Sequence, residues 1–260
     1  MYRSIAFIAL VAALSACSTT GEGSPAESPA TIAAEDARFA LYDASIADAR
    51  RPANEVERDP LRHPREMLAF IGLEPGDRIA DIRPEEGYFT RLFAAVVGDA
   101  GHAYAFVPNQ TAGRENAYAD TLATEYPGVV SRVTGDLDSL SFPEPLDVVF
   151  SAQEYHDFHI ERFNADPNAM NRAIFAALKP GGLYIIIDHE AAAGSGISAV
   201  ESLHRIEGAY LRREVEAAGF EFAGESRAVR NPDDDHTVNV FNEAIRGRTD
   251  QFVYRFRKPE

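Results

Sequence analysis

The chain has 260 residues, of which 45% are hydrophobic and 10% aromatic, so it can bury a sizeable core and is not disordered throughout. Its formal net charge of −16 opposes binding to phosphate backbones, so no nucleic-acid partner is expected. The one cysteine, Cys17, excludes an intramolecular disulfide framework and a zinc site built from several cysteines.

The first residues have the pattern of an export signal. Met1-Tyr2-Arg3 is a short positive start, and residues 5–14 form an apolar run too short to span a bilayer. The following Leu14-Ser15-Ala16-Cys17 resembles the bacterial lipobox, whose cysteine is lipidated after cleavage. A buried amino-terminal helix with an incidental cysteine is the alternative, but residues 18–25 have the composition of a solvated linker.

These patterns predict the domain organisation. Residues 1–17 are a lipoprotein signal peptide with lipidation at Cys17, residues 18–34 are a flexible linker, and residues 35–260 form one domain. The resemblance to lipoproteins, with a serine after the cysteine, implies a periplasmic protein anchored by lipid to the outer membrane. The lipid anchor is then the only expected contact with a membrane.

Helical and strand patterns alternate along the rest of the chain. Apolar residues at helical spacing predict helices at 33–49, 64–72, 89–97, 113–126 and 168–178, and a largely helical stretch at 198–219. Short apolar runs between turns predict strands at 78–82, 102–107, 129–133, 146–151, 183–188, 220–226 and 251–256. The alternation predicts an α/β fold whose mostly parallel sheet binds ligands beyond the carboxyl ends of its strands, with the last two strands as an antiparallel pair at one edge.

The run Lys179-Pro180-Gly181-Gly182 follows a predicted helix. It has the composition of a helix end, in which glycine supplies the left-handed exit and lysine faces the last helix carbonyls.

Four segments, taken together in order and spacing, resemble class I S-adenosylmethionine (SAM)-dependent methyltransferases, particularly the ubiquinone-biosynthesis-like branch and a bacterial group of predicted methyltransferases. They are Arg62-His63-Pro64-Arg65-Glu66 before Leu73-Glu74-Pro75-Gly76, the loop at 81–87, the run at 178–182, and Val215-Glu216-Ala217-Ala218-Gly219-Phe220. The resemblance covers about residues 59–259. It implies a Rossmann-like methyltransferase fold with a seven-stranded sheet and helices on both faces, SAM as cofactor and a small molecule as substrate.

The resemblance also implies a cofactor loop after the first strand, where the family has an acid followed by a glycine-rich turn. Asp81, Arg83, Glu86 and Gly87 are the residues of this chain at the corresponding positions. Only Gly87 keeps a family glycine, so the loop is altered. Two carboxylates beside the turn oppose the carboxylate of the cofactor and attract its ammonium or sulfonium group.

Two further cofactor positions differ in how well they match the family. Val107 stands where the family has an acid that accepts hydrogen bonds from the ribose, and valine has no such acceptor. Asp136, in Gly135-Asp136-Leu137, matches the position of the adenine contact. An Asx turn is the other interpretation of Asp136.

Histidines gather in the loops after the fourth and fifth predicted strands. His156 and His189 are the predicted catalytic residues, since an imidazole at a substrate pocket can take a proton from the methyl acceptor. The same loops also offer metal ligands, namely His156, Asp157, His159, Asp188 and His189. The spacing of these residues matches no established metal signature, so no metal is assigned from the sequence.

Two charged segments near the carboxyl terminus are interpreted as surface. Arg205 can pair with Glu207 or with an anionic substrate, and a surface ion pair is the favoured interpretation. The run Asp233-Asp234-Asp235 is interpreted as a solvated loop, because it lacks the glycine and closing glutamate of a calcium loop.

Three functions remain open. The first is methyl transfer from SAM to a small molecule. The second is a repurposed lipoprotein that binds another ligand or an envelope partner, favoured by the lost glycine and ribose-acid positions and by the cytoplasmic origin of SAM. The third is metal-dependent hydrolysis at the histidine loops.

Overall fold

The computed structural model describes residues 28–260, which surround a seven-stranded sheet in the order β3-β2-β1-β4-β5-β7-β6. Every neighbouring pair is parallel except β5 with β7 and β6 with β7, so the predicted mostly parallel sheet with an antiparallel edge is confirmed. The strands are β1 Arg78–Ile82, β2 His102–Pro108, β3 Val130–Gly135, β4 Leu146–Ala152, β5 Leu178–His189, β6 Glu221–Ser226 and β7 Gln251–Arg257.

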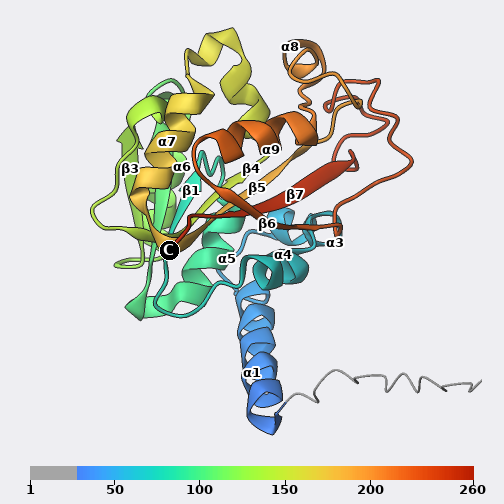
Figure 1. Ribbon diagram of the computed structural model, residues 1–260. Coiled ribbons are helices and arrows are strands. Elements are labelled where there is room, and N and C mark those ends of the chain that lie inside the picture. The colour runs from blue at the N-terminus through green and yellow to red at the C-terminus, as the bar shows by residue number, and fades with distance from the viewer. Residues whose placement is uncertain (1–27) are drawn as a thin grey trace, which may run out of the picture.

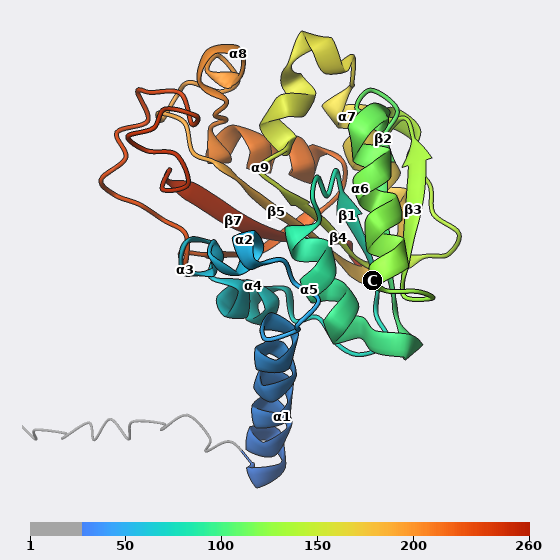
Figure 2. The ribbon, with the colours of Figure 1, turned by 180° about the vertical axis from the view of Figure 1, so that it is seen from behind.

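Helices cover both faces of this sheet, as two opposite views show (Figure 1 and Figure 2). Alternate residues of β4 serve the two faces: Val148 and Phe150 join the core under α4, α5 and α6, and Val149 joins the core under α7 and α9. The α-helices are α1 Pro29–Ile46, α2 Ala53–Val56, α3 Asp59–Arg62, α4 Pro64–Ile71, α5 Tyr88–Val97, α6 Ala112–Glu125, α7 Pro167–Ala177, α8 Val200–Leu203 and α9 Gly208–Ala217; short 3₁₀ turns are η1 Gly98–Ala100, η2 Leu137–Ser139, η3 Tyr155–His159 and η4 Glu161–Phe163. In the part of the chain from residue 28 onward, none of these helices has the length and hydropathy needed to cross a membrane.

The first helix starts earlier than its apolar pattern predicts. Ser28 accepts a hydrogen bond from the Thr31 amide at 3.1 Å, and Pro29 occupies the first helical position, so this pair starts α1 at residue 29. Figure 1 shows α1 projecting from the body. Its carboxyl end is held there by Tyr42, which is fully buried and donates a hydrogen bond to the Leu73 carbonyl at 2.9 Å.

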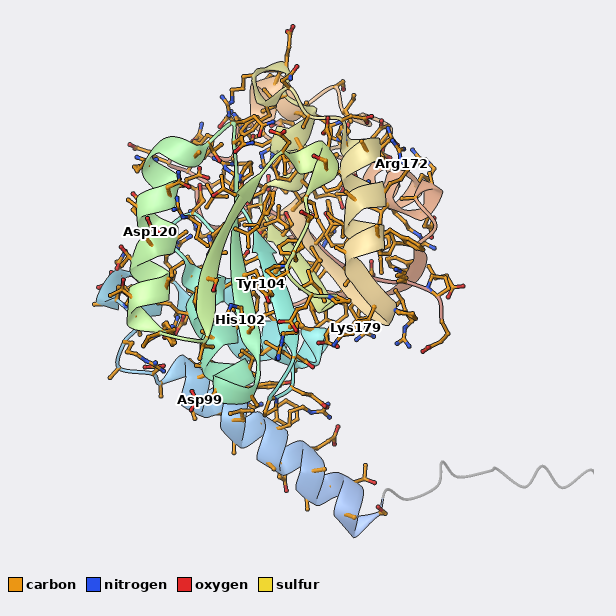
Figure 3. All side chains as sticks on the ribbon, turned by 90° about the vertical axis from the view of Figure 1, so that its left-hand side faces the viewer. Asp99, His102, Tyr104, Asp120, Arg172 and Lys179 are labelled. Atoms are coloured by element: carbon orange, nitrogen blue, oxygen red, sulfur yellow. The ribbon has the colours of Figure 1, made fainter. Side chains whose placement is uncertain are left out.

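The interpretation of Lys179 and the following glycines as a helix cap is wrong. Leu178 is already extended and begins β5, so the chain passes from α7 directly into the sheet. Lys179, labelled in Figure 3, instead pairs with Asp147 at 2.7 Å. The carbonyls of Phe175 in α7 and of Leu178 at the start of β5 instead accept hydrogen bonds from Lys258, because β7 brings the end of the chain beside this helix.

The stretch predicted as largely helical at 198–219 consists of two helices, α8 and α9. His204 has a left-handed backbone (φ 54°) that ends α8, and Ile206 then forms a parallel bridge to Glu190 beyond the end of β5. Arg205, between them, is fully buried, so its interpretation as a surface ion pair is wrong. Its partner is Asp234 at 2.9 Å, which is also buried and corrects the interpretation of that residue as part of a solvated loop.

Candidate functional site

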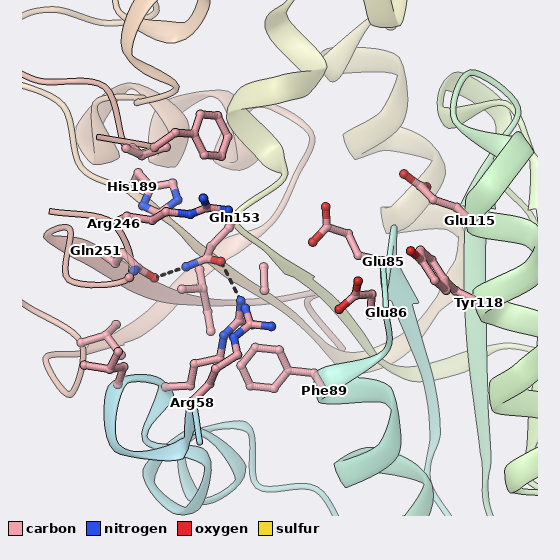
Figure 4. Close-up of a pocket in the computed structure, with 18 of the residues that line it drawn as sticks. Arg58, Glu85, Glu86, Phe89, Glu115, Tyr118, Gln153, His189, Arg246 and Gln251 are labelled. Atoms are coloured by element: carbon pink, nitrogen blue, oxygen red, sulfur yellow. Dashed lines mark hydrogen bonds between the residues drawn. The ribbon is translucent and has the colours of Figure 1, made fainter. Parts of the chain in front are cut away.

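A cavity of about 470 Å³ lies at the carboxyl ends of β1, β4 and β5, where a parallel sheet is expected to bind its ligand. Its lining comes from the loop after β1, the residues that follow β4, the end of β5, helices α3 and α6, and the segment before β7. Figure 4 shows that its labelled charged residues separate onto two walls.

The acidic wall carries Glu85 and Glu86 from the loop after β1, and Glu115 with Tyr118 from α6 (Figure 4). Among residues 28–260, the carboxylates of Glu85 and Glu86 form no salt bridge. Glu115 is buried: one of its oxygens accepts a hydrogen bond from Arg83 at 3.2 Å, while Oε2 has no protein partner within the same residues. This wall therefore offers carboxylate oxygens to a cationic or hydroxyl-bearing ligand.

The opposite wall carries Arg58, Arg246 and His189 (Figure 4). Arg62, at the end of α3, also lines the cavity. Arg62 donates to the Gln153 side chain at 3.0 Å, and Gln153 in turn donates to Gln251 at 3.0 Å. Burial lowers the pKa of Arg62 to about 10, which still leaves it charged at neutral pH. In the described part of the chain, Arg58 and Arg246 form no salt bridge, so their guanidinium groups remain for an anionic ligand.

Four of the five predicted cofactor residues, Asp81, Arg83, Glu86 and Gly87, line a smaller adjoining cavity of about 40 Å³. The fifth, Asp136, lines neither cavity and accepts a hydrogen bond from Asn109 at 2.7 Å, without forming a side-chain cap. The structure therefore brings the loop residues together and leaves Asp136 apart from them.

Arg83 has a left-handed backbone (φ 57°), and its side chain is held by carboxylates. It forms ion pairs with Glu154, with Glu115 at 3.2 Å and with Asp157 at 3.1 Å. Although burial opposes its charge, these carboxylates hold the pKa of Arg83 above its usual value. The guanidinium thus connects the loop after β1 with α6 and with η3.

Asp81, at the end of β1, is buried and accepts a hydrogen bond from Thr90 at 2.6 Å. Burial raises its pKa to about 7, and the Thr90 hydrogen bond only partly opposes that shift. Asp81 is therefore poised between its neutral and ionised forms near physiological pH.

The two histidines predicted as catalytic lie in different environments. His189 lines the large cavity, and its Nδ1 is 2.7 Å from Thr249 Oγ1. Burial lowers its pKa to about 3, so it is neutral at physiological pH and does not hold an abstracted proton stably. His156 lies outside the cavity lining, with its ring centre 5.8 Å from that of His189.

His156 belongs to a buried cluster behind that wall. Its Nδ1 is 2.7 Å from Asp188 Oδ1, and its Nε2 is 3.2 Å from Asp157 Oδ1 and 3.3 Å from His204 Nδ1. Burial alone lowers the pKa of His156, but Asp188 and Asp157 outweigh it and raise the value to about 10. His159 is not part of this cluster, since its Nε2 is 3.0 Å from Glu214.

Several cavity residues are absent from the sequence-based site prediction. They reach the cavity from segments between positions 58 and 251, and no single motif joins them: Arg58, Arg62, Gln153, Arg246 and Gln251. Two of them carry a sequence signal. Arg62 belongs to a segment that carries the family resemblance, and Gln153 directly follows a predicted strand whose carboxyl end faces the expected site.

No protein-family model matches the chain. Among curated proteins, it is 31% identical over 128 residues to the ubiquinone/menaquinone biosynthesis C-methyltransferase UbiE of Ectopseudomonas mendocina (strain ymp). The match covers 48% of this chain and 46% of that protein, so it spans about half the length of the curated relative.

Solved structures with the same fold span nearly the whole described domain. A SAM-dependent methyltransferase from Aquifex aeolicus has a TM-score of 0.57 at 17% identity and covers 82% of this chain and 97% of its own. The 1,6-didemethyltoxoflavin-N1-methyltransferase of Burkholderia thailandensis has a TM-score of 0.54 at 17% identity, over 92% of this chain and 93% of its own. The chain therefore has the Rossmann-like methyltransferase fold predicted from the sequence.

The residues at the large cavity fit one part of SAM. A ligand that carries sulfonium, ammonium and carboxylate groups matches a cavity with free carboxylates on one wall and guanidinium groups on the other. The usual nucleoside contacts are not matched, because Val107 is a fully buried valine and Asp136 lies apart. Among residues 28–260, Glu115 Oε2 is a buried acceptor without a hydrogen-bond partner, on a residue that lines the cavity.

Proposed function

We propose that the chain is a small-molecule methyltransferase that binds SAM in the large cavity. The observation that carries this proposal is the separation of charge across the cavity, with Glu85 and Glu86 facing Arg58 and Arg246. The fold and the partial similarity to a C-methyltransferase support it. SAM, when bound, supplies an electrophilic methyl group.

The residues of the chain have distinct proposed roles around that ligand. Glu85 and Glu86 attract the cationic groups. Arg62 at the end of α3 and Arg58 just before that helix attract the carboxylate. Glu115 Oε2 accepts a ribose hydroxyl. His189 remains neutral and orients the methyl acceptor by a hydrogen bond, while Thr249 fixes its ring.

Calorimetric titration of SAM and S-adenosylhomocysteine into the 260-residue chain tests this proposal. We expect micromolar binding of both ligands. Glu86→Gln should weaken the binding of SAM by roughly threefold and the binding of S-adenosylhomocysteine less, because only SAM carries the sulfonium charge. Glu221→Gln, on the exposed face of β6, is the matched control. No binding at millimolar ligand, or equal losses in both glutamate variants, contradicts the proposal.

A second candidate function is the binding of a different zwitterionic ligand without methyl transfer. The observation that favours it is Arg83, which stands at a family glycine position and is fixed by three carboxylates. In that case SAM fails to bind, and a zwitterion without a nucleoside, such as methionine or phosphocholine, raises the melting temperature. Loss of that shift in Arg58→Gln would assign the ligand to the cavity.

We also propose that the protein is a periplasmic lipoprotein anchored to the outer membrane through Cys17. This proposal depends on the lipobox-like sequence alone, since Cys17 lies outside the described residues. The location bears on function, because SAM is made in the cytoplasm and a periplasmic methyltransferase needs an exported supply. Absence of such a supply would favour the second candidate function.

A further inference from the structure

Three potential ligand atoms converge beside the cavity. They are His156 Nε2, Asp157 Oδ1 and His204 Nδ1, and their separations are 3.0 Å, 3.2 Å and 3.3 Å. The two segments that supply them are 47 residues apart: η3 follows β4, and His204 ends α8. We propose that these three side chains bind a divalent transition-metal ion. This inference does not depend on the proposed methyltransferase function.

The distances suit such an ion. Zinc binds histidine nitrogen at about 2.0–2.1 Å and carboxylate oxygen at about 2.0–2.2 Å. Three atoms at the corners of a triangle with sides of 3.0–3.3 Å can all lie at such a distance from one point above the triangle. Two imidazole nitrogens and a carboxylate oxygen are also a donor set that first-row transition metals prefer.

Neighbouring residues hold two of the three ligands in place. Asp188 Oδ1 lies 2.7 Å from His156 Nδ1, and Asp188 Oδ2 accepts from the His156 amide at 2.7 Å. A carboxylate on the far nitrogen holds a proton there, so the Nε2 lone pair becomes available once a metal ion displaces the proton on Nε2. The second oxygen of Asp157 accepts a hydrogen bond from Arg83 at 3.1 Å, which leaves Oδ1 directed at the two histidines.

The local charge favours a cation. One connected cluster holds four buried carboxylates, those of Glu115, Glu154, Asp157 and Asp188. Arg83, whose side chain is 14% exposed, pairs with three of them. Arg162 lies 3.7 Å from Asp157, but its side chain is 62% exposed and contributes little. Burying several carboxylates around one guanidinium is costly, and a divalent ion would offset that cost.

The site adjoins the cavity. The ring of Phe241, which lines the cavity, packs edge-on against His204 with 4.9 Å between ring centres. His204 is the most accessible ligand, with 14% of its side chain exposed. Three protein ligands leave at least one coordination position for water or for a ligand group, and the side of His204 is where solvent reaches it.

Metal binding is measured on the 260-residue chain after treatment with EDTA and dialysis, without SAM. Titration with ZnCl₂ should show one equivalent bound in the micromolar range or tighter, and Zn²⁺ should raise the melting temperature. Titration with CoCl₂ should give visible d–d absorption, whose intensity separates four-coordinate from six-coordinate binding. The absence of a stoichiometric site for both ions overturns the proposal, whatever the outcome with SAM.

Variants locate the ion. His204→Ala should lose the stoichiometric site, and Asp188→Asn should weaken it by about 10-fold to 100-fold through the orientation of His156. His63→Ala, whose side chain is 41% exposed and far from the cluster in sequence, is the matched control and should bind normally. Should His204→Ala fail to fold, the cobalt spectrum of the unaltered chain still decides whether the site exists. Unchanged binding by folded His204→Ala assigns the ion elsewhere and refutes the proposal.

Discussion

Arg83 Nη1 lies 3.1 Å from Asp157 Oδ2, and this contact joins the altered loop after β1 to the turn that follows β4. Asp157 uses its other oxygen in the cluster with His156 and His204. The residue at a family glycine position therefore shares a partner with the proposed metal site. The altered loop after β1 therefore connects the large cavity with the proposed metal site. A substitution in one of these sites is expected to change ligand binding in the other.

Arg83→Met is predicted to destabilise the fold by about 3–5 kcal/mol, because it leaves buried carboxylates without their cation. Urea denaturation followed by circular dichroism measures the loss. Arg132→Met removes an exposed ion pair with Asp120 and should cost less than about 1 kcal/mol. Adding Glu154→Gln to Arg83→Met should recover part of the loss, since it removes one unpaired charge. Equal stabilities of the two single arginine variants would show that the buried cluster is not needed.

The strands and helices that build the domain were predictable, because buried parallel strands are continuous apolar runs and their helices carry apolar faces at regular spacing. The cavity walls were not, since they depend on contacts distant in sequence. Gln153 and Gln251 are 98 residues apart and meet only because β7 pairs with β5. The sequence around Arg205 indicates a surface residue, because its buried partner Asp234 lies on a loop distant in sequence.

The contacts of individual histidines also could not be predicted from the sequence. The position of the histidine loops after β4 and β5 follows from the alternation of strands and helices. The sequence does not show which histidines meet. His159 bonds to Glu214 and His189 bonds to Thr249, while His204 joins His156 from within a stretch predicted to be largely helical. The left-handed backbone of His204 ends α8 and has no signature in the sequence.

Cys17→Ser is predicted to move the protein from the membrane fraction to the soluble periplasmic fraction. The lipid that would be attached to Cys17 is the only membrane contact we propose, and a serine cannot be processed as a lipobox cysteine. Fractionation of cells and immunoblotting measure the shift, with Ser18→Ala as the control that keeps the cysteine. Retention of the Cys17→Ser protein with membranes would rule out the lipoprotein assignment.

Arg205→Met is predicted to cost about 3–5 kcal/mol of stability, because it leaves Asp234 buried and unpaired. The guanidinium also donates to the carbonyls of Glu190 and Val238 at 3.0 Å each, so its loss frees the loop from the end of β5. Arg172→Met, in an exposed pair with Asp166, is the control and should change stability by less than about 1 kcal/mol. Chemical denaturation compares the two, and a similar small change in both would mean that Arg205 is not needed to hold the loop.

The raised pKa of Asp81 leads us to predict that the stability of the protein depends on pH. Its carboxyl has a pKa of about 7 in the folded protein against the ordinary 3.8, so the folded state keeps a proton that the unfolded chain releases near pH 4. The free energy of unfolding should therefore fall as pH rises from 4 to 7, by up to ~4 kcal/mol from this group.

The variant Asp81→Asn tests this dependence, because it keeps the shape of the side chain and an acceptor for Thr90 but cannot ionise. Denaturation at pH 5, 6.5 and 8 should show the variant gaining on the unaltered protein as pH rises, whereas exposed Asp99→Asn should follow the unaltered protein throughout. Parallel curves for Asp81→Asn and the unaltered protein would show that burial does not hold this proton.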